Sequence, residues 1–449
     1  MSDVPVTLRL AERAVESRRS GLPAAATDAA ASALLDWCAV AIGGSQEPPT
    51  QKLRTALVGS HGGSQLVGVP AKAEPATAAL VNGTAAHALE LDDIYAPGLY
   101  HPGAPTIAAA LAVAERQGAS GDRLLRGIVV GFEVGNRVAE TLGPAHYTHW
   151  HTTGTAGSIA AAAAGAEVLE LDSERFAHSL ALASTMASGL QQTFRSDSMG
   201  KPLHSGHAAQ VGVVAALSAA VGYEGSLDVL DGPIGLGAVM SDSPSWDTAG
   251  EPFGPDYLVQ RTTVKPYSCC GHAFAAIDAS LQLADAGLRL ADIVSVEVQS
   301  YATALAVAGN PAPTTTFEAK FSIPFVVTCA LREGRLRTDA FTDGTLADPT
   351  VRESLKAVTL HESEEFTKAF PERRGARVVV RDTHGRRHEA TVPDRRGDPS
   401  NPMTPAEMEQ KFTGLVEPVL GSARAGHLQQ QVRSLATLPD VRALGVGTA

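Results

Sequence analysis

A nearly continuous helical pattern occupies the first half of the chain, from Val4 to about Val221. Apolar residues recur there at helical spacing, as in Asp28–Ile42, a run that two glycines end. The pattern predicts further helices at 74–93, 104–117, 122–142, 153–169, 173–192 and 206–221. Several of these segments are largely alanine and glycine, and small side chains let helix backbones approach closely. The sequence therefore predicts a compact helical bundle.

The pattern changes after Gly254, where strand signals appear. Valines alternate with polar residues at 294–298, and 377–381 and 388–392 flank a turn typical of a hairpin. Helices are predicted at 321–332 and 348–356, a further strand at 358–360, and helices again from Thr404. The predicted fold is mostly α: a helical domain at 1–263, an α+β domain at 264–400, and C-terminal helices at 401–449 that return to the helical domain.

Composition limits the classes of partner and cofactor. A length of 449 residues favours two domains, and a net charge of −12 argues against nucleic acid or an anionic membrane as the main partner. The four cysteines form no CxxC pair, which argues against a zinc or iron–sulfur site and against a disulfide framework. No signal peptide is evident, and the apolar run 156–166 is too short to span a bilayer. We expect a cytoplasmic protein without a membrane partner.

The stretch from His87 to Pro105, HALELDDIYAPGLYHPGAP, contains residues suited to acid–base chemistry. On a helix, Glu90 is an i, i+3 neighbour of both His87 and Asp93. His101 follows on a loop stiffened by proline. A carboxylate at a helix end and an imidazole on a rigid loop make a suitable acid–base pair. The structural alternative is that the acidic residues close a helix and His101 fills a turn.

A second group of histidines precedes a predicted helix, in HYTHWHTTGTAG at 146–157. His149 and His151 are two residues apart, which is poor spacing for one helix face. The helix N-terminus that follows offers free N–H groups that favour a bound carboxylate. The alternative is that the threonines cap the helix and the histidines are ordinary loop residues.

Lysines occur with histidines in two further motifs, SMGKPLHSGHAAQ at 198–210 and VKPYSCCGHAF at 264–274. Their ionisable groups are Lys201, His204, His207, Lys265, Tyr267, Cys269, Cys270 and His272. The adjacent thiols have no resolving pattern or triad spacing, so we interpret them as structural.

These groups together favour chemistry on a small anion without a cofactor. Neither a GxGxxG sequence after a strand nor a Walker sequence is present. The HxH pair lacks a third metal ligand at suitable spacing, so no metal is expected. Lysines would neutralise carboxylates, and a His/Asp pair would move a proton at the adjacent carbon, where enolate-like charge develops.

Seven segments, in order, resemble the MmgE/PrpD family, which includes 2-methylcitrate dehydratase, cis-aconitate decarboxylase and iminodisuccinate epimerase. They are LDWCAVAIGG, NGTAAHALELDD, HPGAPTIAAALAVAE, HTTGTAGSIAAAAA, GKPLHSGHAAQ, KPYSCCGHAFAAIDA and KFSIPFVV. The resemblance implies a helical domain, an α+β lid domain, a metal-free site between them, and a homodimer.

By these motifs, the resemblance implies a site built from Glu90 or Asp93, His101, His151, Lys201, Lys265 and His272. We expect His101, tuned by Asp93 or Glu90, to transfer the proton. The lysines would bind substrate carboxylates, helped by His204 and by Arg195. His151 and His272 are further acid–base or carboxylate-binding candidates.

The acidic motif departs from the family pattern, which opens with Asp and closes with a hydroxyl residue; here these positions are Glu90 and Ile94. Which of Glu90, Asp92 and Asp93 faces the pocket depends on helix phase, and helical spacing favours Glu90 and Asp93. The leading hypothesis is a dehydratase or decarboxylase of a di- or tricarboxylic acid. An epimerase or isomerase using the same groups is the alternative, and a binding protein without activity is a third reading.

Overall fold

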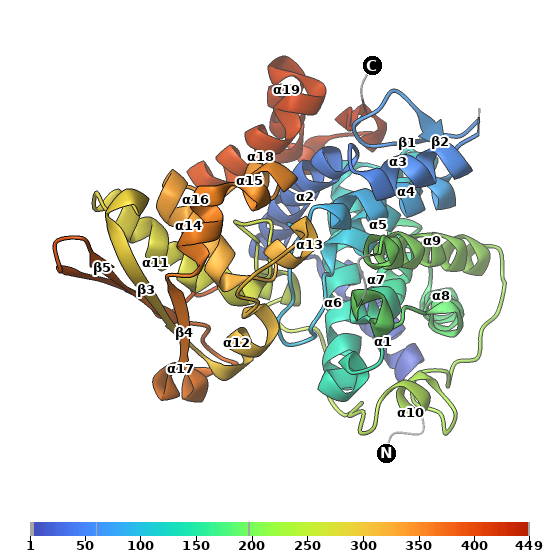
Figure 1. Ribbon diagram of the computed structural model, residues 1–449. Helices are drawn as coiled ribbons and strands as arrows, with labels where there is room; N and C mark the ends of the chain where they lie inside the picture. Colours follow the sequence, from blue (N-terminus) through green and yellow to red (C-terminus); the bar gives the residue numbers. More distant parts are fainter. Residues whose placement is uncertain (1–3, 60, 196–197, 448–449) are drawn as a thin grey trace. The chain divides into compact units, whose positions relative to one another are not determined.

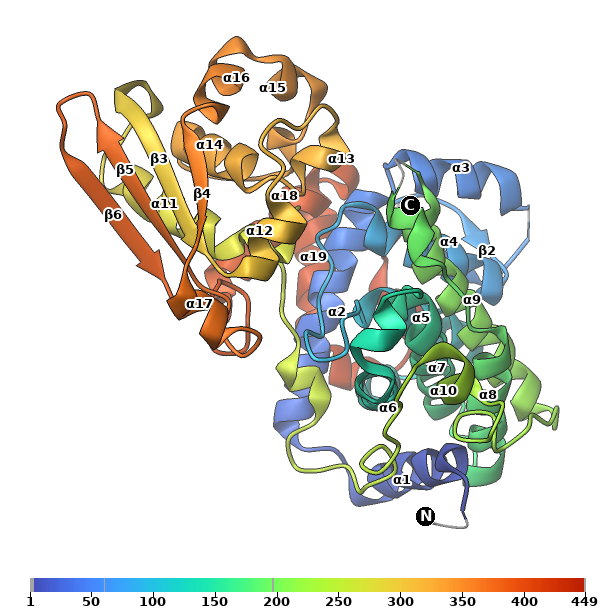
Figure 2. The same ribbon diagram turned by 60° about the horizontal axis from the view of Figure 1, so that its bottom comes forward.

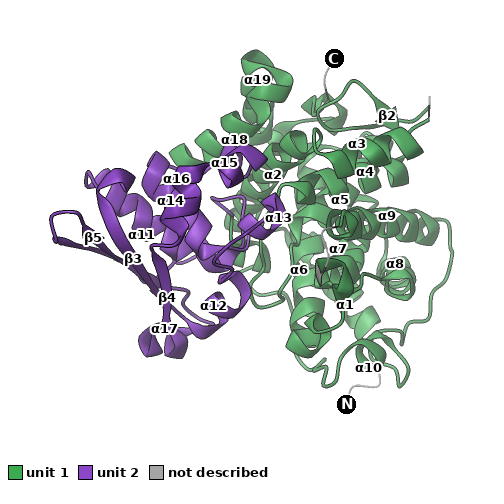
Figure 3. Ribbon diagram, in the orientation of Figure 1, with its two compact units in different colours: residues 1–264, 404–449 green, residues 265–403 purple. Residues whose placement is uncertain are grey.

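The computed structural model describes residues 4–59, 61–195 and 198–447, except for the side chain of Arg195. Its contacts divide the chain into two compact units (Figure 3). Unit 1 comprises Met1–Val264 and Thr404–Ala449, and unit 2 comprises Lys265–Met403. The C-terminal helices therefore belong to the same unit as the N-terminal ones.

Unit 1 is built almost entirely of helices (Figure 1). Its α-helices are α1 (Val6–Ser20), α2 (Ala24–Gly44), α3 (Pro48–Leu57), α4 (Pro75–Ala88), α5 (Gly103–Gln117), α6 (Gly121–Tyr147), α7 (Thr152–Val168), α8 (Ser173–Met186), α9 (Gly200–Ala220), α10 (Leu236–Met240), α18 (Pro405–Leu420) and α19 (Ser422–Arg433). Shorter elements are β1 (Ser64–Gln65), β2 (Lys72–Ala73), η1 (Gln191–Arg195), η2 (Leu258–Arg261), η6 (Leu435–Thr437) and η7 (Val441–Leu444).

Helix α7 forms the centre of unit 1, and every one of its residues is buried. It packs against α5, α6, α8 and α9 (Figure 2). Small residues make this packing possible. A Cβ atom at Gly212 of α9 would lie 2.3 Å from Cβ of Ala161, so any larger residue would separate the two helices. The compact bundle predicted from the alanine and glycine content is confirmed.

Helix α2 is the one described helix that is long and apolar enough to cross a membrane by length and composition alone. Over half of its most apolar window, 56%, is buried inside the protein. It packs against α4 and α18, and Asp36 of α2 forms an ion pair of 2.5 Å with Lys411 of α18. These contacts are those of a core helix.

Unit 2 combines a sheet with helices, as predicted for an α+β region. Its strands are β3 (Ile293–Ser300), β4 (Val358–Glu362), β5 (Ala376–Asp382) and β6 (Arg387–Val392). Its helices are η3 (Gly271–Ala273), α11 (Phe274–Asp285), η4 (Leu290–Asp292), α12 (Ala302–Ala308), α13 (Thr316–Ala319), α14 (Ile323–Glu333), η5 (Thr338–Ala340), α15 (Asp343–Ala347), α16 (Pro349–Leu355) and α17 (Glu364–Ala369).

The strand order in unit 2 is β4-β3-β5-β6, with β3 and β4 parallel and the other pairs antiparallel. Val298 of β3 is in register with Leu360 of β4 and with Val378 of β5. Helix α11 packs on β5 and β6, and its apolar residues form the core of unit 2 with those of the sheet and of α14.

Candidate active site

Helix α4 ends at Ala88, five residues before the predicted end at Asp93. Glu90 then takes a left-handed backbone conformation, with φ of 58°. A left-handed non-glycine residue is uncommon and turns the chain out of the helix. The expected i, i+3 relations of Glu90 with His87 and Asp93 are therefore wrong, because these residues do not share a helix.

Asp92 links two histidines in this loop. Its Oδ2 atom lies 2.7 Å from Nδ1 of His87 and 3.4 Å from Nδ1 of His101. The two imidazole rings meet edge to face, with their centroids 4.7 Å apart. The carboxylate beside His101 is therefore that of Asp92, and the expected pairing of His101 with Asp93 or Glu90 is corrected.

Asp93 has a different environment. Its Oδ1 atom accepts a hydrogen bond of 2.9 Å from the N–H of Gly103, the first residue of α5. Burial, and then the nearby charge of Asp92, raises the pKa of Asp93 well above its ordinary value. Asp93 thus closes the loop onto α5 and favours its uncharged form.

Lys201 lies in the first turn of α9, where its ammonium group pairs with the carboxylate of Glu90. The same ammonium lies 5.4 Å from the centre of the Phe194 ring. Helix α9 begins six residues before the predicted start, so the lysine is held by a helix and not by a turn. Arg195, the other expected anion contact here, has a side chain outside the described residues.

His151 and His204 form a second imidazole pair. Their Nδ1 atoms are 3.2 Å apart, so one ring donates and the other accepts. Burial and the surrounding cationic and imidazole groups lower the pKa of His151 well below its ordinary value. Burial also lowers the pKa of His204 to about 4. Both rings are therefore neutral near pH 7.

These side chains form one continuous group, which we call the histidine cluster: His87, Asp92, His101, His151 and His204. His87, Asp92 and His151 are buried, whereas the side chain of His101 is 14% exposed. Lys201 and Glu90, each with 12%, are also partly exposed. The groups that a ligand can reach are thus an imidazole, an ammonium and a carboxylate.

Three members of the cluster have the composition of a metal site. His87, Asp92 and His101 each place a ligand atom within 4.8 Å of the other two. Two histidines and one carboxylate form a donor set found in metalloenzymes. The sequence motif HxH at His149 and His151 does not contribute to this set.

The two predicted site residues of the α+β region, Lys265 and His272, lie in unit 2. Lys265 is buried. Nδ1 of His272 forms a hydrogen bond of 2.7 Å with the hydroxyl of Tyr301. Burial, with the nearby Arg374 and Arg395, lowers the pKa of His272 to about 3, so this imidazole is neutral as well.

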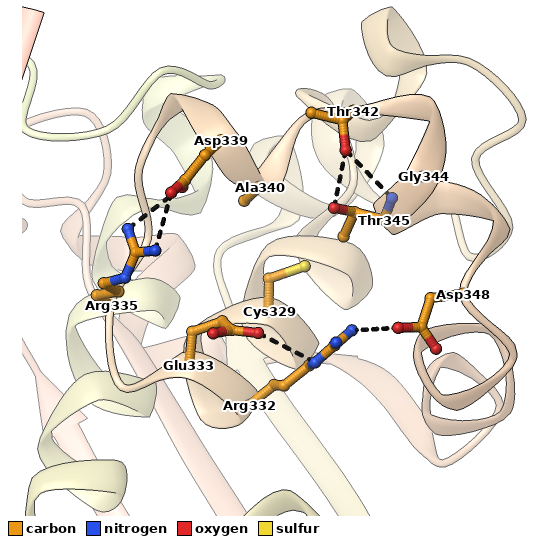
Figure 4. Close-up of a pocket in the computed structure, with 10 residues that line it drawn as sticks. All are labelled: Cys329, Arg332, Glu333, Arg335, Asp339, Ala340, Thr342, Gly344, Thr345 and Asp348. Carbon is orange, nitrogen blue, oxygen red and sulfur yellow. Dashed lines mark hydrogen bonds and ion pairs between the residues drawn. The ribbon is translucent and has the colours of Figure 1, made fainter.

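A separate cavity of about 410 Å³ lies in unit 2 and contains none of the predicted residues (Figure 4). Its charged groups pair with one another: Arg335 with Asp339, and Arg332 with Asp348. Burial raises the pKa of the Cys329 thiol in its wall to about 12, so this thiol is not a nucleophile at neutral pH.

The sequence interpretation missed four contributors to these arrangements: His87 as a member of the cluster, Phe194 beside Lys201, Tyr301 beside His272, and Lys411, which donates to the main-chain oxygen of Leu91. Phe194 lies seven residues before Lys201, so proximity in sequence is a usable signal there. Tyr301 and Lys411 are far from their partners in sequence, and no motif marks them.

Comparisons with known proteins identify the family of the chain. The MmgE/PrpD N-terminal domain model matches residues 8–249, and the MmgE/PrpD C-terminal domain model matches residues 267–437. The cis-aconitate decarboxylase-like protein oryM of Aspergillus oryzae is 28% identical over 467 residues, covering 98% of this chain and 96% of that protein. Human cis-aconitate decarboxylase is also 28% identical, covering 82% of this chain and 78% of its own. The chain belongs to the MmgE/PrpD family.

Proposed function

We propose that the protein is a lyase that decarboxylates a small unsaturated tricarboxylic acid of the cis-aconitate class, without a metal or organic cofactor. The observation that carries the proposal is that His101, the partly exposed member of the histidine cluster, lies beside the carboxylate of Asp92. Lys201 and Glu90, which are also partly exposed, belong to the same unit. The likeness to cis-aconitate decarboxylases over nearly the whole chain supports this substrate class.

Lys201 is the proposed anchor for a substrate carboxylate. Its ammonium is held at the start of a helix, where the helix dipole also favours an anion. In the free protein this ammonium group pairs with the carboxylate of Glu90. A substrate carboxylate would displace Glu90 from Lys201 and leave the Glu90 carboxylate beside the bound acid.

His101 is the proposed proton donor. Loss of carbon dioxide breaks a carbon–carbon bond, and the electron pair stays on the substrate, delocalised toward a neighbouring carboxylate. A proton from the imidazolium form of His101 to carbon completes the reaction: one carbon dioxide leaves and one proton enters. Asp92 stabilises that imidazolium and orients its ring, as the carboxylate does in other His–Asp pairs.

The neutral imidazoles of His151 and His204 fit a binding role in this scheme. A neutral ring can donate one hydrogen bond to a carboxylate without adding a second positive charge. Their lowered pKa values favour this state at neutral pH.

The test is carbon dioxide release from a panel containing cis-aconitate, citrate, 2-methylcitrate and iminodisuccinate. We expect release from cis-aconitate, and loss of most activity in His101→Ala with the helical circular dichroism retained. His427→Ala, an exposed histidine on α19, is the matched control and is expected to behave as wild type. Full activity in His101→Ala, or no release from any acid of the panel, would contradict the proposal.

A further inference from the structure

The three threonines at the start of α7, Thr152, Thr153 and Thr155, are all buried, but their hydroxyl groups have different contacts. The hydroxyl of Thr155 lies 2.7 Å from Nε2 of His146. The hydroxyl of Thr153 accepts a hydrogen bond of 3.2 Å from the main-chain N–H of His101. The hydroxyl of Thr152 has no hydrogen-bond partner among the described residues. Of these three residues, Thr153 is the one that hydrogen-bonds to the loop of His101.

The hydroxyl of Thr153 does not cap its own helix. His151 is the N-cap residue of α7, and its side chain makes no capping hydrogen bond. The main-chain N–H groups of Gly154 and Thr155 donate to the carbonyl of His151, at 2.8 and 3.3 Å. Threonine near a helix start commonly bonds to main-chain groups close by in sequence, whereas His101 is 52 residues from Thr153. The bond between them is therefore a tertiary contact that joins the loop to α7.

Buried side chains hold every main-chain donor of the segment His101–Gly103. Pro102 has no N–H. The N–H of His101 donates to Thr153, and the N–H of Gly103 donates to Oδ1 of Asp93 at 2.9 Å. Thr153 is 0% exposed and Asp93 is 6% exposed. The main chain is thus fixed on both sides of the proline, which leaves the imidazole of His101 only its own side-chain torsions.

The start of α7 is itself held in place, so it can fix a neighbouring loop. The N–H of His151 donates to the carbonyl of Gly189 at 2.8 Å. A Cβ atom at Gly154 would lie 2.2 Å from the main-chain oxygen of Ser188, so the two backbones are in close contact. The hydroxyl of Thr153 therefore belongs to a part of the bundle that has little room to shift.

The position of the His101 main chain matters because its ring shares a carboxylate with another imidazole. Nδ1 of His101 lies 3.4 Å from Oδ2 of Asp92, and Nδ1 of His87 lies 2.7 Å from the same oxygen. A small displacement of His101 would leave Asp92 paired with His87 alone. A misplacement of about 1 Å can lower an enzymatic rate by about 10²-fold.

We propose that Thr153 is a positioning residue, whose hydroxyl fixes the main chain of His101 so that the imidazole faces both Asp92 and the substrate. The part that concerns the substrate rests on the proposed function above; the placement of the imidazole beside Asp92 does not. Thr153 acts only through His101, because its own side chain is fully buried.

The kinetic test compares Thr153→Val, which keeps the shape of threonine and lacks the hydroxyl, with wild type on cis-aconitate. We expect kcat to fall about 10- to 100-fold while KM changes less than about threefold, because a displaced proton donor slows the reaction more than it weakens binding. Thr153→Ser keeps the acceptor and should retain a kcat within about threefold of wild type. An unchanged kcat in Thr153→Val would overturn the proposal.

Thr152→Val is the matched control. Thr152 is the preceding residue, is 1% exposed, and has a hydroxyl without a described hydrogen-bond partner. Removing that hydroxyl should leave kcat and KM as in the wild type. An equal loss of kcat in Thr152→Val and Thr153→Val would overturn the proposal, because the loss would then not depend on the bond to His101.

Thermal unfolding separates positioning from a purely structural role. Thr153→Val leaves the N–H of His101 without its acceptor, so we expect a lower Tm than that of the wild type. The kinetic comparison is therefore made at a temperature where every variant is folded. A lower Tm of Thr153→Val together with an unchanged kcat would assign Thr153 a structural role only and overturn the proposal.

Nitrogen-15 NMR of histidine-labelled protein without substrate keeps the two proposals distinguishable. The signals of His101 are identified by their loss in His101→Ala. In Thr153→Val we expect the His101 amide to exchange its hydrogen about tenfold faster or more, and the ring nitrogen signals to shift, with neither change in Thr152→Val. If cis-aconitate is not turned over, the proposed function fails, yet these changes would still support the placement of the imidazole. Unshifted ring signals in Thr153→Val would overturn it.

Discussion

The Oδ2 atom of Asp92 lies 2.7 Å from Nδ1 of the buried His87 and 3.4 Å from Nδ1 of His101. Asp92→Asn keeps the shape of this group and removes its charge, so the imidazolium of His101 loses its stabilising partner. We expect kcat to fall by about 10²-fold or more. Steady-state kinetics with the candidate acid measures this.

Asp93→Asn is the matched control for that variant. The amide keeps an acceptor for the Gly103 N–H and resembles the uncharged carboxyl that burial favours. We expect it to retain activity within about tenfold of wild type, a small part of the range that acid–base catalysis covers. A larger loss in Asp93→Asn than in Asp92→Asn would reverse the assignment of the two acids.

Lys411 fixes the same loop from the C-terminal helix α18. Its ammonium pairs with Asp36 at 2.5 Å and donates to the Leu91 carbonyl at 2.9 Å. Lys411→Met leaves Asp36 buried without its partner, so we expect a loss of about 3–5 kcal/mol in unfolding free energy. Denaturant unfolding measures the loss.

The double variant Lys411→Met with Asp36→Leu removes the stranded charge. The double variant should recover most of the unfolding free energy that Lys411→Met loses. It should not recover enzymatic activity, because the Leu91 carbonyl still lacks its hydrogen-bond donor. If the double variant recovers its activity as fully as its stability, then Lys411 does not position the loop.

Glu115 predicts a pH dependence of stability. It is buried, accepts a hydrogen bond from the N–H of Gln65 at 2.8 Å, and burial raises its pKa from 4.5 to about 8. Between these values the unfolded chain is ionised and the folded chain keeps the proton. Folding stability from this group is therefore complete below about pH 4.5 and is lost as pH rises toward 8.

Glu115→Gln removes that titration. We expect the free energy of unfolding of wild type to fall relative to that of Glu115→Gln as pH rises from 5 to 8, by at most about 1.4 kcal/mol per pH unit, and the Tm of wild type to fall with it. Scanning calorimetry at matched ionic strength measures the difference. A constant difference across this range would show that Glu115 is ionised in the folded protein.

Metal dependence is testable because His87, Asp92 and His101 form a possible donor set. If the cluster acts through hydrogen bonds, dialysis against EDTA leaves the activity unchanged and added Zn²⁺ or Mn²⁺ does not raise it. Activity that disappears on dialysis and returns with one metal would instead assign these residues as ligands.

Much of the fold was predictable because the periodicities are strong. The predicted strand at 377–381 corresponds to β5 (Ala376–Asp382), and the reason is a run of β-branched residues directly before a turn typical of a hairpin. Helix ends were less predictable. The sequence LEL after α4 continues a helical pattern, but Glu90 leaves the helix in a left-handed conformation and pairs with Lys201, a contact 111 residues away.

The site was predictable in its residue types more than in its pairings. Sequence motifs single out His101, His151 and Lys201, and the structure places all three in unit 1. Asp92 and Asp93 are neighbours whose side chains point to different partners, and only the loop conformation separates them.

The most direct test of the central claim is proton and carbon NMR of cis-aconitate with the enzyme in D₂O. The account predicts one carbon dioxide released per molecule and one deuterium at a single carbon of the product, with neither change in His101→Ala. Deuterium exchange into an intact tricarboxylate, or addition or loss of water with all three carboxylates retained, would contradict decarboxylation.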